Sequence, residues 1–473
     1  MRRFLSLLGV WLGLQASNAV AQYSFDFNAY YRTGIGYSRS NVDQVCYNQP
    51  GWPDLIPRLG NECGNYGEFM FYKNYKPQGE NPKAPWMRGG ITFSLAADGN
   101  QSEEKTRPEN RPAGAGESSQ FDFDWANREL YIEGINFFGE GSRIWVGKRF
   151  YRRLHIPIWD FFILQNNGSG FGLMDYSVGS GHLSVAWLRR TSNADDSQPF
   201  HNNFDLRYAF PVGKSKLELI AIAGEQAPLD HRSGERKWIK VPGQSLTINW
   251  EHNERPYQYK IIGQVGKGLY GARPDHYQGG WSTGATVGRF DEQAFADSDP
   301  AAVERAEAWK KSASYRLVTN LLWNPDANYY VDMAAFYGVA DFGGRKDSQG
   351  EELENRNTFA IGARPTYMFS DHHSIEADYY YSLIENGVPY QDRNFQTKYD
   401  GKPIDRELHK LTMAYVLRPL PFEWAKPVIR FYGTVAKWND KTKGDNYLTG
   451  YLRPLYENKT TGYTIGVMGE AWL

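Results

Sequence analysis

The stretch FDFNAYYRTGIGYS, residues 25–38, alternates in character from one residue to the next. One row of alternate residues is apolar, and the other is polar but contains Tyr30 and Arg32. Successive side chains of a β-strand point to opposite faces, so this pattern predicts a strand with one apolar face and one polar face. In a soluble sheet the polar row would face water. The presence of Tyr30 and Arg32 in that row then needs an explanation.

The same alternation recurs along the chain to its end. It is clear in EWAKPVIRFYGTVAKW (423–438) and in GYTIGVMGEAWL (462–473). Long polar stretches separate such segments, for example residues 96–119, and loops of this length are unusual in a compact soluble domain. A transmembrane barrel explains them, because it has short turns at one end and long loops at the other. In one of these long connections the sequence predicts a helix over residues 300–311, with Asp299 as its N-cap.

Composition agrees with a barrel whose strands cross a membrane. Aromatic residues make up 15% of the chain, with 32 Tyr, 26 Phe and 15 Trp beside 48 Gly. The mean hydropathy is -0.62, and after residue 21 no apolar run reaches the roughly 20 residues that a membrane-spanning helix needs. We therefore expect an all-β fold, a transmembrane antiparallel barrel formed by one domain over residues 22–473, with the apolar rows facing lipid.

The first 21 residues have the order of a cleavable secretory signal. Two arginines precede a short apolar run, and small residues end the segment at Ala21. An amphipathic or core helix is the less favoured alternative. Export leads to an oxidising compartment, where Cys46 and Cys63 are expected to form a disulfide worth about 3 kcal/mol in the chain-entropy model.

Large rings lie in the same polar rows as charges. If the apolar rows face lipid, these side chains line the inside of the barrel, and two explanations remain open. The rings pack against one another, or they stack on a ligand such as a sugar, whose ring faces suit aromatics and whose hydroxyls suit arginines and carboxylates. The residues concerned are Tyr30, Arg32, Tyr66, Glu68, Trp424 and Trp472.

Several short segments, in order along the chain, resemble the maltoporin family of outer-membrane sugar channels. They are YYRTGIGYS, RLGNECGNY, NRELYIEG, IWVGKRFYRR followed by DFF, GARPTY, WAKPVIRFYGTVAKW and TIGVMGEAW. The resemblance implies an 18-stranded barrel in the outer membrane of a Gram-negative cell, a homotrimer, and passive, selective uptake of oligosaccharides. Its expected partners are an oligosaccharide substrate and membrane lipid.

The resemblance also implies which residues contact the sugar. In that family an aromatic slide guides the sugar and a polar track beside it exchanges hydrogen bonds with the hydroxyls. The slide residues carried over are Tyr30, Tyr66, Phe162, Trp424 and Trp472, and the polar-track residues are Arg32, Arg58, Glu68, Arg128, Arg153 and Asp160.

One of these residues conflicts with strict alternation. Arg128 falls in the same row as Leu130 and Ile132. We therefore expect either that the strand begins after Arg128 or that this residue belongs to a loop that bends inward.

The stretch HIPIWDFFILQNNGSGFGLMDY, residues 155–176, matches the family's loop that folds into the lumen and forms the constriction. Its three glycines, Gly168, Gly170 and Gly172, are expected to supply positive-φ turns. Phe162 stands where maltose-selective members carry a tyrosine, and His155 replaces a carboxylate, which leaves the sugar open. A slide aromatic from a neighbouring subunit has no clear counterpart in residues 96–120.

Other functions find less support in the sequence. There is no H-E-x-x-H and no G-x-S-x-G, so neither a metalloprotease nor a hydrolase is indicated, and we expect no catalytic residues, cofactor or metal. A net charge of -1 argues against nucleic-acid binding. The remaining alternatives are a related channel for sucrose or β-glucosides, a non-selective diffusion porin, and an adhesin or receptor acting through the long loops.

Overall fold

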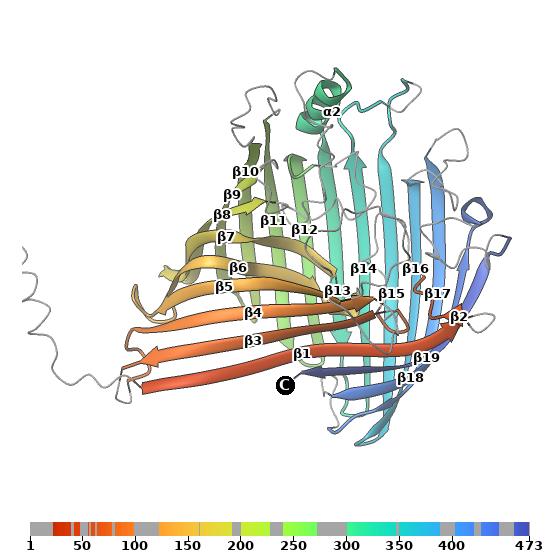
Figure 1. Ribbon diagram of the computed structural model, residues 1–473, viewed down its shortest axis with the longest axis horizontal. Helices are drawn as coiled ribbons and strands as arrows, with labels where there is room; N and C mark the ends of the chain where they lie inside the picture. The colour runs from red at the N-terminus through yellow and green to blue at the C-terminus, as the bar shows by residue number, and fades with distance from the viewer. Residues whose placement is uncertain are drawn as a thin grey trace, which may run out of the picture.

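Figure 1 shows the computed structural model, whose strands form one closed wall. The structure describes residues 22–38, 42–47, 55, 58–61, 64–77, 81–98, 123–159, 161–191, 200–227, 240–271, 300–346, 350–387, 403–420, 427–443 and 458–472. The expected signal segment, residues 1–21, lies outside them, as do Cys63, Asp160, Asp299 and Trp424. The export signal and the disulfide therefore stay predictions.

The barrel is built from antiparallel strands, each paired with its two neighbours. The described residues form one sheet of 19 strands, of which β2 (Val42–Asp43) is a two-residue strand between β1 and β3; the other 18 close the wall when β19 pairs with β1. The wall consists of β1 (Gln22–Ser38), β3 (Gly64–Lys76), β4 (Trp86–Asp98), β5 (Phe123–Ile135), β6 (Arg143–Ile156), β7 (Phe161–Val178), β8 (Gly181–Thr191), β9 (Phe200–Val212), β10 (Ser215–Ala227), β11 (Val241–Glu254), β12 (Tyr257–Gly268), β13 (Ala313–Trp323), β14 (Tyr329–Asp341), β15 (Arg356–Ser370), β16 (His373–Gly387), β17 (Ile404–Leu417), β18 (Val428–Trp438) and β19 (Thr461–Trp472). The fold expected from the sequence is confirmed.

The connections differ between the two ends of the barrel. Two-residue turns join β7 to β8, β9 to β10, β11 to β12 and β15 to β16 at one end. The other end carries the long connections, including residues 269–312 with the helix α2 (Pro300–Lys311), which begins at the proline as expected. Among the described residues no helix is both long and apolar enough to cross a membrane.

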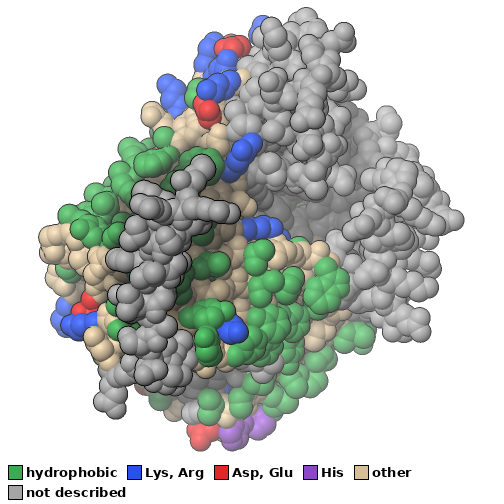
Figure 2. All heavy atoms as spheres, turned by 60° about the vertical axis from the view of Figure 1, so that its left-hand side comes forward, with side chains coloured by type: hydrophobic (Ala, Val, Ile, Leu, Met, Phe, Trp, Pro, Cys, Tyr) green, Lys and Arg blue, Asp and Glu red, His purple; other side chains and the backbone are tan. Residues whose placement is uncertain are grey.

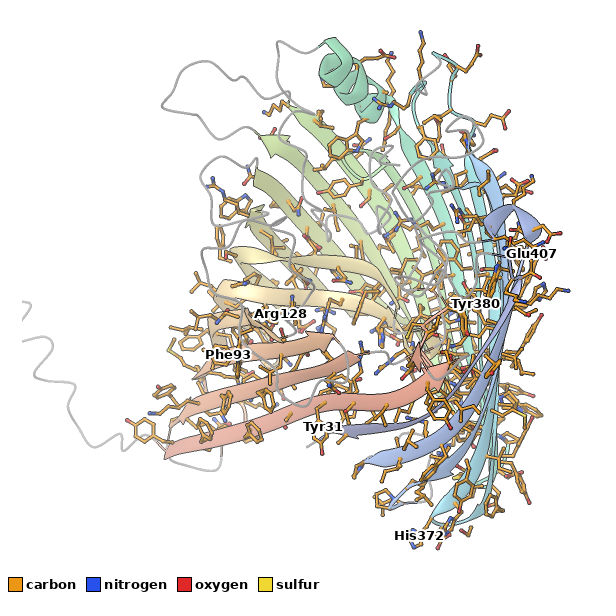
Figure 3. All side chains as sticks on the ribbon, turned by 45° about the vertical axis from the view of Figure 1, so that its right-hand side comes forward. Tyr31, Phe93, Arg128, His372, Tyr380 and Glu407 are labelled. Carbon is orange, nitrogen blue, oxygen red and sulfur yellow. The ribbon has the colours of Figure 1, made fainter. Side chains whose placement is uncertain are left out.

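Alternation along β1 separates an outer face from an inner face. Phe25 and Ile35 are 66% and 62% exposed, whereas Tyr30 is 6% exposed. Figure 3 shows Tyr31 outside β1 and Tyr380 on the inner side of β16, and Figure 2 shows hydrophobic side chains over much of the described outer wall. Apolar rows outside and polar rows inside are the arrangement that a lipid bilayer imposes on a barrel.

The hairpin of β6 and β7 leaves the wall and folds into the lumen. β5 pairs with β6 only as far as Lys148, and β8 pairs with β7 only from Ser169. Between these points β6 and β7 pair with each other alone. The tip, the 3-10 turn η3 (Pro157–Trp159), contacts the opposite wall: Trp159 meets Tyr380 edge-on at 6.2 Å. The expected inward fold is present, as a hairpin with a short tip.

The expectation about the three glycines of this hairpin is wrong. Gly168, Gly170 and Gly172 lie in strand β7, and none is among the glycines with positive φ. A Cβ at Gly170 would lie 1.9 Å from the carbonyl oxygen of Trp187 on β8. These glycines therefore allow β7 to approach β8 closely. Positive φ occurs instead at Arg152, beside an irregularity in the pairing of β6 with β7.

A second inward segment, between β1 and β3, packs on the inner faces of β17–β19. The carbonyl oxygen of Leu59 accepts hydrogen bonds from Lys410 Nζ at 2.7 Å and Thr412 Oγ1 at 3.2 Å. Gly60 follows with φ +75°, and a Cβ there would lie 2.1 Å from Thr434 Oγ1. Only glycine fits this close, left-handed position. The two inward segments fill part of the lumen and leave a cavity between them.

Candidate functional site

A cavity of about 610 Å³ lies inside the barrel where β1, β3 and β19 face the tip of the β6–β7 hairpin. Its lining combines rings with charged groups from distant parts of the chain. Among the residues singled out in the sequence, those lining the cavity are Tyr30, Arg32, Arg58, Tyr66, Glu68, Arg153, His155, Phe162 and Trp472.

Three rings form one side of the cavity, which we call the aromatic wall: Tyr30, Tyr66 and Trp472. The register pairs Tyr30 of β1 with Trp472 of β19 and with Glu68 of β3. The Tyr30 ring lies 4.5 Å from the Trp472 ring and 6.3 Å from the Tyr66 ring, in both cases tilted. Trp472 lines the cavity and is 53% exposed, so about half of its surface is accessible inside the barrel.

The hairpin tip supplies an opposing ring. Phe162 of β7 stacks on His155 of β6 with ring centroids 4.5 Å apart. The guanidinium of Arg153 lies 4.4 Å from the Phe162 ring centroid, within cation–π distance. The hairpin is held across the lumen by Lys260, whose Nζ donates to the carbonyl oxygen of His155 at 3.3 Å. The tip therefore presents an aromatic surface beside cationic groups.

The polar groups next to Tyr30 are linked in a chain. Arg58 donates to the Tyr30 hydroxyl, and its guanidinium lies 3.5 Å from a Glu470 carboxylate oxygen. Arg430 then bridges two carboxylates, Glu470 at 3.2 Å and Glu376 at 3.0 Å. Charge-assisted bonds of this kind fix side-chain orientation, because Arg430 is held by two carboxylates and Arg58 by one carboxylate and one hydroxyl.

The far side of the cavity, on β15, β16 and β18, is an ionic wall that the sequence analysis did not assign to the site. We define it as Arg364, Glu376 and Arg430. Arg364 is paired with buried Asp378 at 2.7 Å and also donates to the Ile158 carbonyl oxygen of the hairpin tip at 3.3 Å. Alternation had placed Arg430 in an inward row, but nothing in the row indicated its partner on β16. Other lining residues that were not assigned from the sequence are Leu59, Pro157, Leu322, Tyr330, Asp332, Met468 and Glu470.

Arg128 points inward, although neither expected explanation for it is correct. β5 begins at Phe123, before Arg128, so the residue belongs to a strand. Thr92 of β4 pairs with Glu129 and the adjacent Phe93 pairs with Asn127, so Arg128 is the extra residue of a β-bulge. The bulge reverses the alternation, and Arg128 Nε donates to Ser94 Oγ at 2.6 Å. It is not among the residues that line the cavity.

A closed barrel with an apolar exterior and a polar, ring-bearing lumen defines the class of outer-membrane β-barrel porins. Within that class, residues 25–473 match the model of the LamB porin family, and the chain belongs to this family. It is 25% identical to the maltoporin of Hahella chejuensis, over 94% of this chain and 92% of that protein. Identity to a maltoporin of Vibrio cholerae is 26%, covering 96% of each.

Solved structures with a related outline are less similar. Acinetobacter baumannii OccAB1 gives a TM-score of 0.47 at 8% identity, covering 95% of this chain and 96% of that one. Pseudomonas aeruginosa OccK1 (OpdK) gives a TM-score of 0.45 at 8% identity, covering 95% and 98%.

Proposed function

We propose that this protein is a channel for passive, selective diffusion of maltose- and maltodextrin-like oligosaccharides across the outer membrane. The observation that carries the proposal is the cavity, where the half-exposed indole of Trp472 stands beside Tyr30 and the Arg58–Glu470 pair. Sugar rings stack their C–H faces on aromatic rings, and their hydroxyls need both donors and acceptors at the rim. The maltoporin relatives support the same substrate class.

In this proposal the aromatic wall acts as the slide and the charged groups as the polar track. A sugar exchanges one set of hydrogen bonds for the next as it moves, so no covalent bond is made or broken and no cofactor takes part. Because Arg58, Glu470 and Arg430 are already paired with one another, they are held in place before the sugar arrives, which lowers the entropic cost of binding. Trp424 and Asp160 remain predicted members of the slide and track, and the homotrimer remains a prediction.

The preferred sugar depends on the hairpin tip. Phe162 lacks the hydroxyl that a tyrosine would offer, and it is covered by His155 and Arg153. Since the phenyl ring neither donates nor accepts a hydrogen bond, this tip satisfies fewer sugar hydroxyls than one with a tyrosine would. The same geometry is compatible with sucrose or a β-glucoside as the preferred substrate, which a comparison of sugars would decide.

The experiment is single-channel recording in a planar bilayer with maltose, maltodextrins, sucrose and β-glucosides added in turn. We expect saturable block of the ion current, strongest for maltodextrins of several glucose units. Preferential block by sucrose or a β-glucoside would reassign the substrate. Current that is unaffected by every sugar at high concentration would contradict a selective channel and indicate a non-selective pore.

A further inference from the structure

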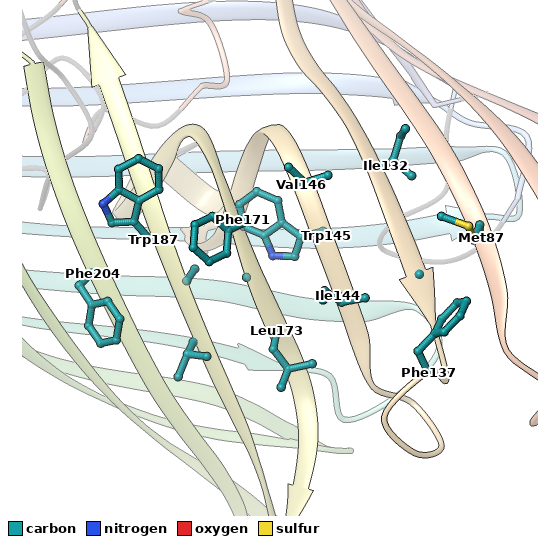
Figure 4. A pocket seen from close by; sticks show the side chains of 14 residues that line it. Met87, Ile132, Phe137, Ile144, Trp145, Val146, Phe171, Leu173, Trp187 and Phe204 are labelled. Atoms are coloured by element: carbon teal, nitrogen blue, oxygen red, sulfur yellow. The ribbon is translucent and has the colours of Figure 1, made fainter. Parts of the chain in front are cut away.

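The outer wall over β5–β9 carries an apolar groove, separate from the lumen. Its volume is about 610 Å³, and Figure 4 shows the side chains that line it. The register places one row of these side chains across five neighbouring strands, β5 to β9. We call this feature the wall groove and define it by Ile132, Val146, Phe171, Trp187 and Phe204.

Cations stand directly above the wall groove, toward the long-loop end. Lys148 of β6 pairs with Ser169 of β7, and Ser169 pairs with Arg189 of β8. All three are exposed, and they lie two residues along their strands from the aromatic row that contains Phe171. Since neighbouring strands are about 4.8 Å apart, the backbones of Lys148 and Arg189 are separated by about 10 Å.

The outward face of the opposite wall carries charges of both signs at its long-loop end, with Lys437 of β18 near three carboxylates. Glu385 of β16 and both Asp405 and Glu407 of β17 lie in outward rows there. Figure 3 shows Glu407 at the end of the barrel opposite to His372, which belongs to the short turn between β15 and β16. The cationic pair above the wall groove, with uncharged Ser169 between its members, differs from this surface of mixed charge.

Orientation in the membrane decides what meets this surface. Long loops of outer-membrane barrels face the cell exterior, so Lys148 and Arg189 lie at the level of the outer-leaflet headgroups. The principal lipid of that leaflet is a glycolipid with a phosphorylated disaccharide and several acyl chains. Its two phosphates stand at opposite ends of the disaccharide, which suits two cations separated by two strands better than a glycerophospholipid with one phosphate does.

We propose that Lys148, Arg189 and the wall groove form a binding site for a doubly phosphorylated glycolipid of the outer leaflet. The two cations contact the phosphates, and an acyl chain lies in the groove against Phe171 and Trp187. An acyl chain is already in hydrocarbon, so the groove contributes close packing rather than removal of apolar surface from water. The phosphate contacts supply most of the selectivity.

The test is native mass spectrometry of the full-length protein in detergent, titrated with diphosphorylated lipid A. The variant Lys148→Ala/Arg189→Ala is expected to bind it about 30-fold more weakly, which corresponds to about 1 kcal/mol for each cation. The matched control is Lys437→Ala. It removes an outward lysine near the long-loop end of β18, a strand that does not contribute to the wall groove. This control is expected to leave lipid binding unchanged.

Two further arms make the test decisive. Dephosphorylated lipid A and phosphatidylglycerol should both bind the wild type weakly, and Trp187→Ala should weaken binding of the diphosphorylated lipid without altering sugar block. Equal affinity of the double variant and the wild type would overturn the proposal, as would equal binding of phosphatidylglycerol. A change of oligomeric state in Trp187→Ala with lipid binding intact would assign the groove to a second copy of the chain and also overturn it.

Discussion

The aromatic wall and the ionic wall face each other across the same cavity, yet their polar groups are used differently. In the aromatic wall Trp472 is 53% exposed, so about half of its surface is accessible inside the barrel. In the ionic wall Glu376 is 2% exposed and accepts from Arg430 and also from Arg418, at 3.0 Å and 3.1 Å. Both walls face inward by alternation and both line the cavity, but the largest exposed side chain of the two is Trp472, whereas the charges of the ionic wall are paired with one another.

We expect the largest effect on stability when the carboxylate shared by two arginines of the ionic wall region is removed. Glu376→Ala leaves two arginines that are largely buried without their common partner, so we expect the free energy of unfolding to fall by about 3–5 kcal/mol. The measurement is urea unfolding of the barrel in lipid vesicles. Glu68→Ala is the control, because Glu68 accepts a hydrogen bond from Tyr66 at a partly exposed position, and its loss should change stability by about 1 kcal/mol or less. Equal losses in the two variants would erase the distinction between the walls.

Removing an open ring should affect sugar binding more than folding. Trp472→Ala is expected to weaken sugar block by about 1–3 kcal/mol, roughly 5-fold to 150-fold in concentration, because a stacking surface is lost. Single-channel recording with maltodextrins measures this change, and Trp472→Phe should recover part of it. Unchanged block in the alanine variant would remove Trp472 from the substrate path.

A smaller change at the hairpin tip tests its part in selectivity. Phe162→Tyr adds one hydroxyl to a ring that lines the cavity, and we expect it to shift preference toward maltodextrins by up to about tenfold, the range of about one hydrogen bond. The ratio of half-blocking concentrations for a maltodextrin and sucrose reports the shift. The same ratio in both proteins would show that this position does not select the sugar.

The smallest effect is expected at Arg128. Its side chain points inward through the bulge of β5 and contacts Ser94, but it does not line the cavity. Arg128→Gln should therefore change sugar block by less than about twofold, since no direct contact with the sugar is lost. Block that weakens as strongly as in Trp472→Ala would place Arg128 on the substrate path.

Alternation predicted the two faces of each strand and, with the long polar stretches and the composition, the barrel, because lipid on one side and water on the other impose the same period of two on every strand. It failed locally where the backbone departs from that period. The bulge at Arg128 moves this side chain from the outward row to the inward row. The glycines of β7 allow that strand to approach β8 closely, whereas the sequence was interpreted as placing turns at Gly170 and its neighbours.

The sequence by itself determined the class of fold and the outward and inward rows. Most of the slide and track residues named through the resemblance line the cavity. Only the tertiary structure decided which inward residues meet at one level of the lumen. Arg430 and Glu376 are 54 residues apart in the chain and become partners because β16, β17 and β18 lie side by side and their side chains project into one interior. The physical reason is that side-chain period is a local property of a strand, whereas register, bulges and inward-folding segments depend on contacts between distant segments.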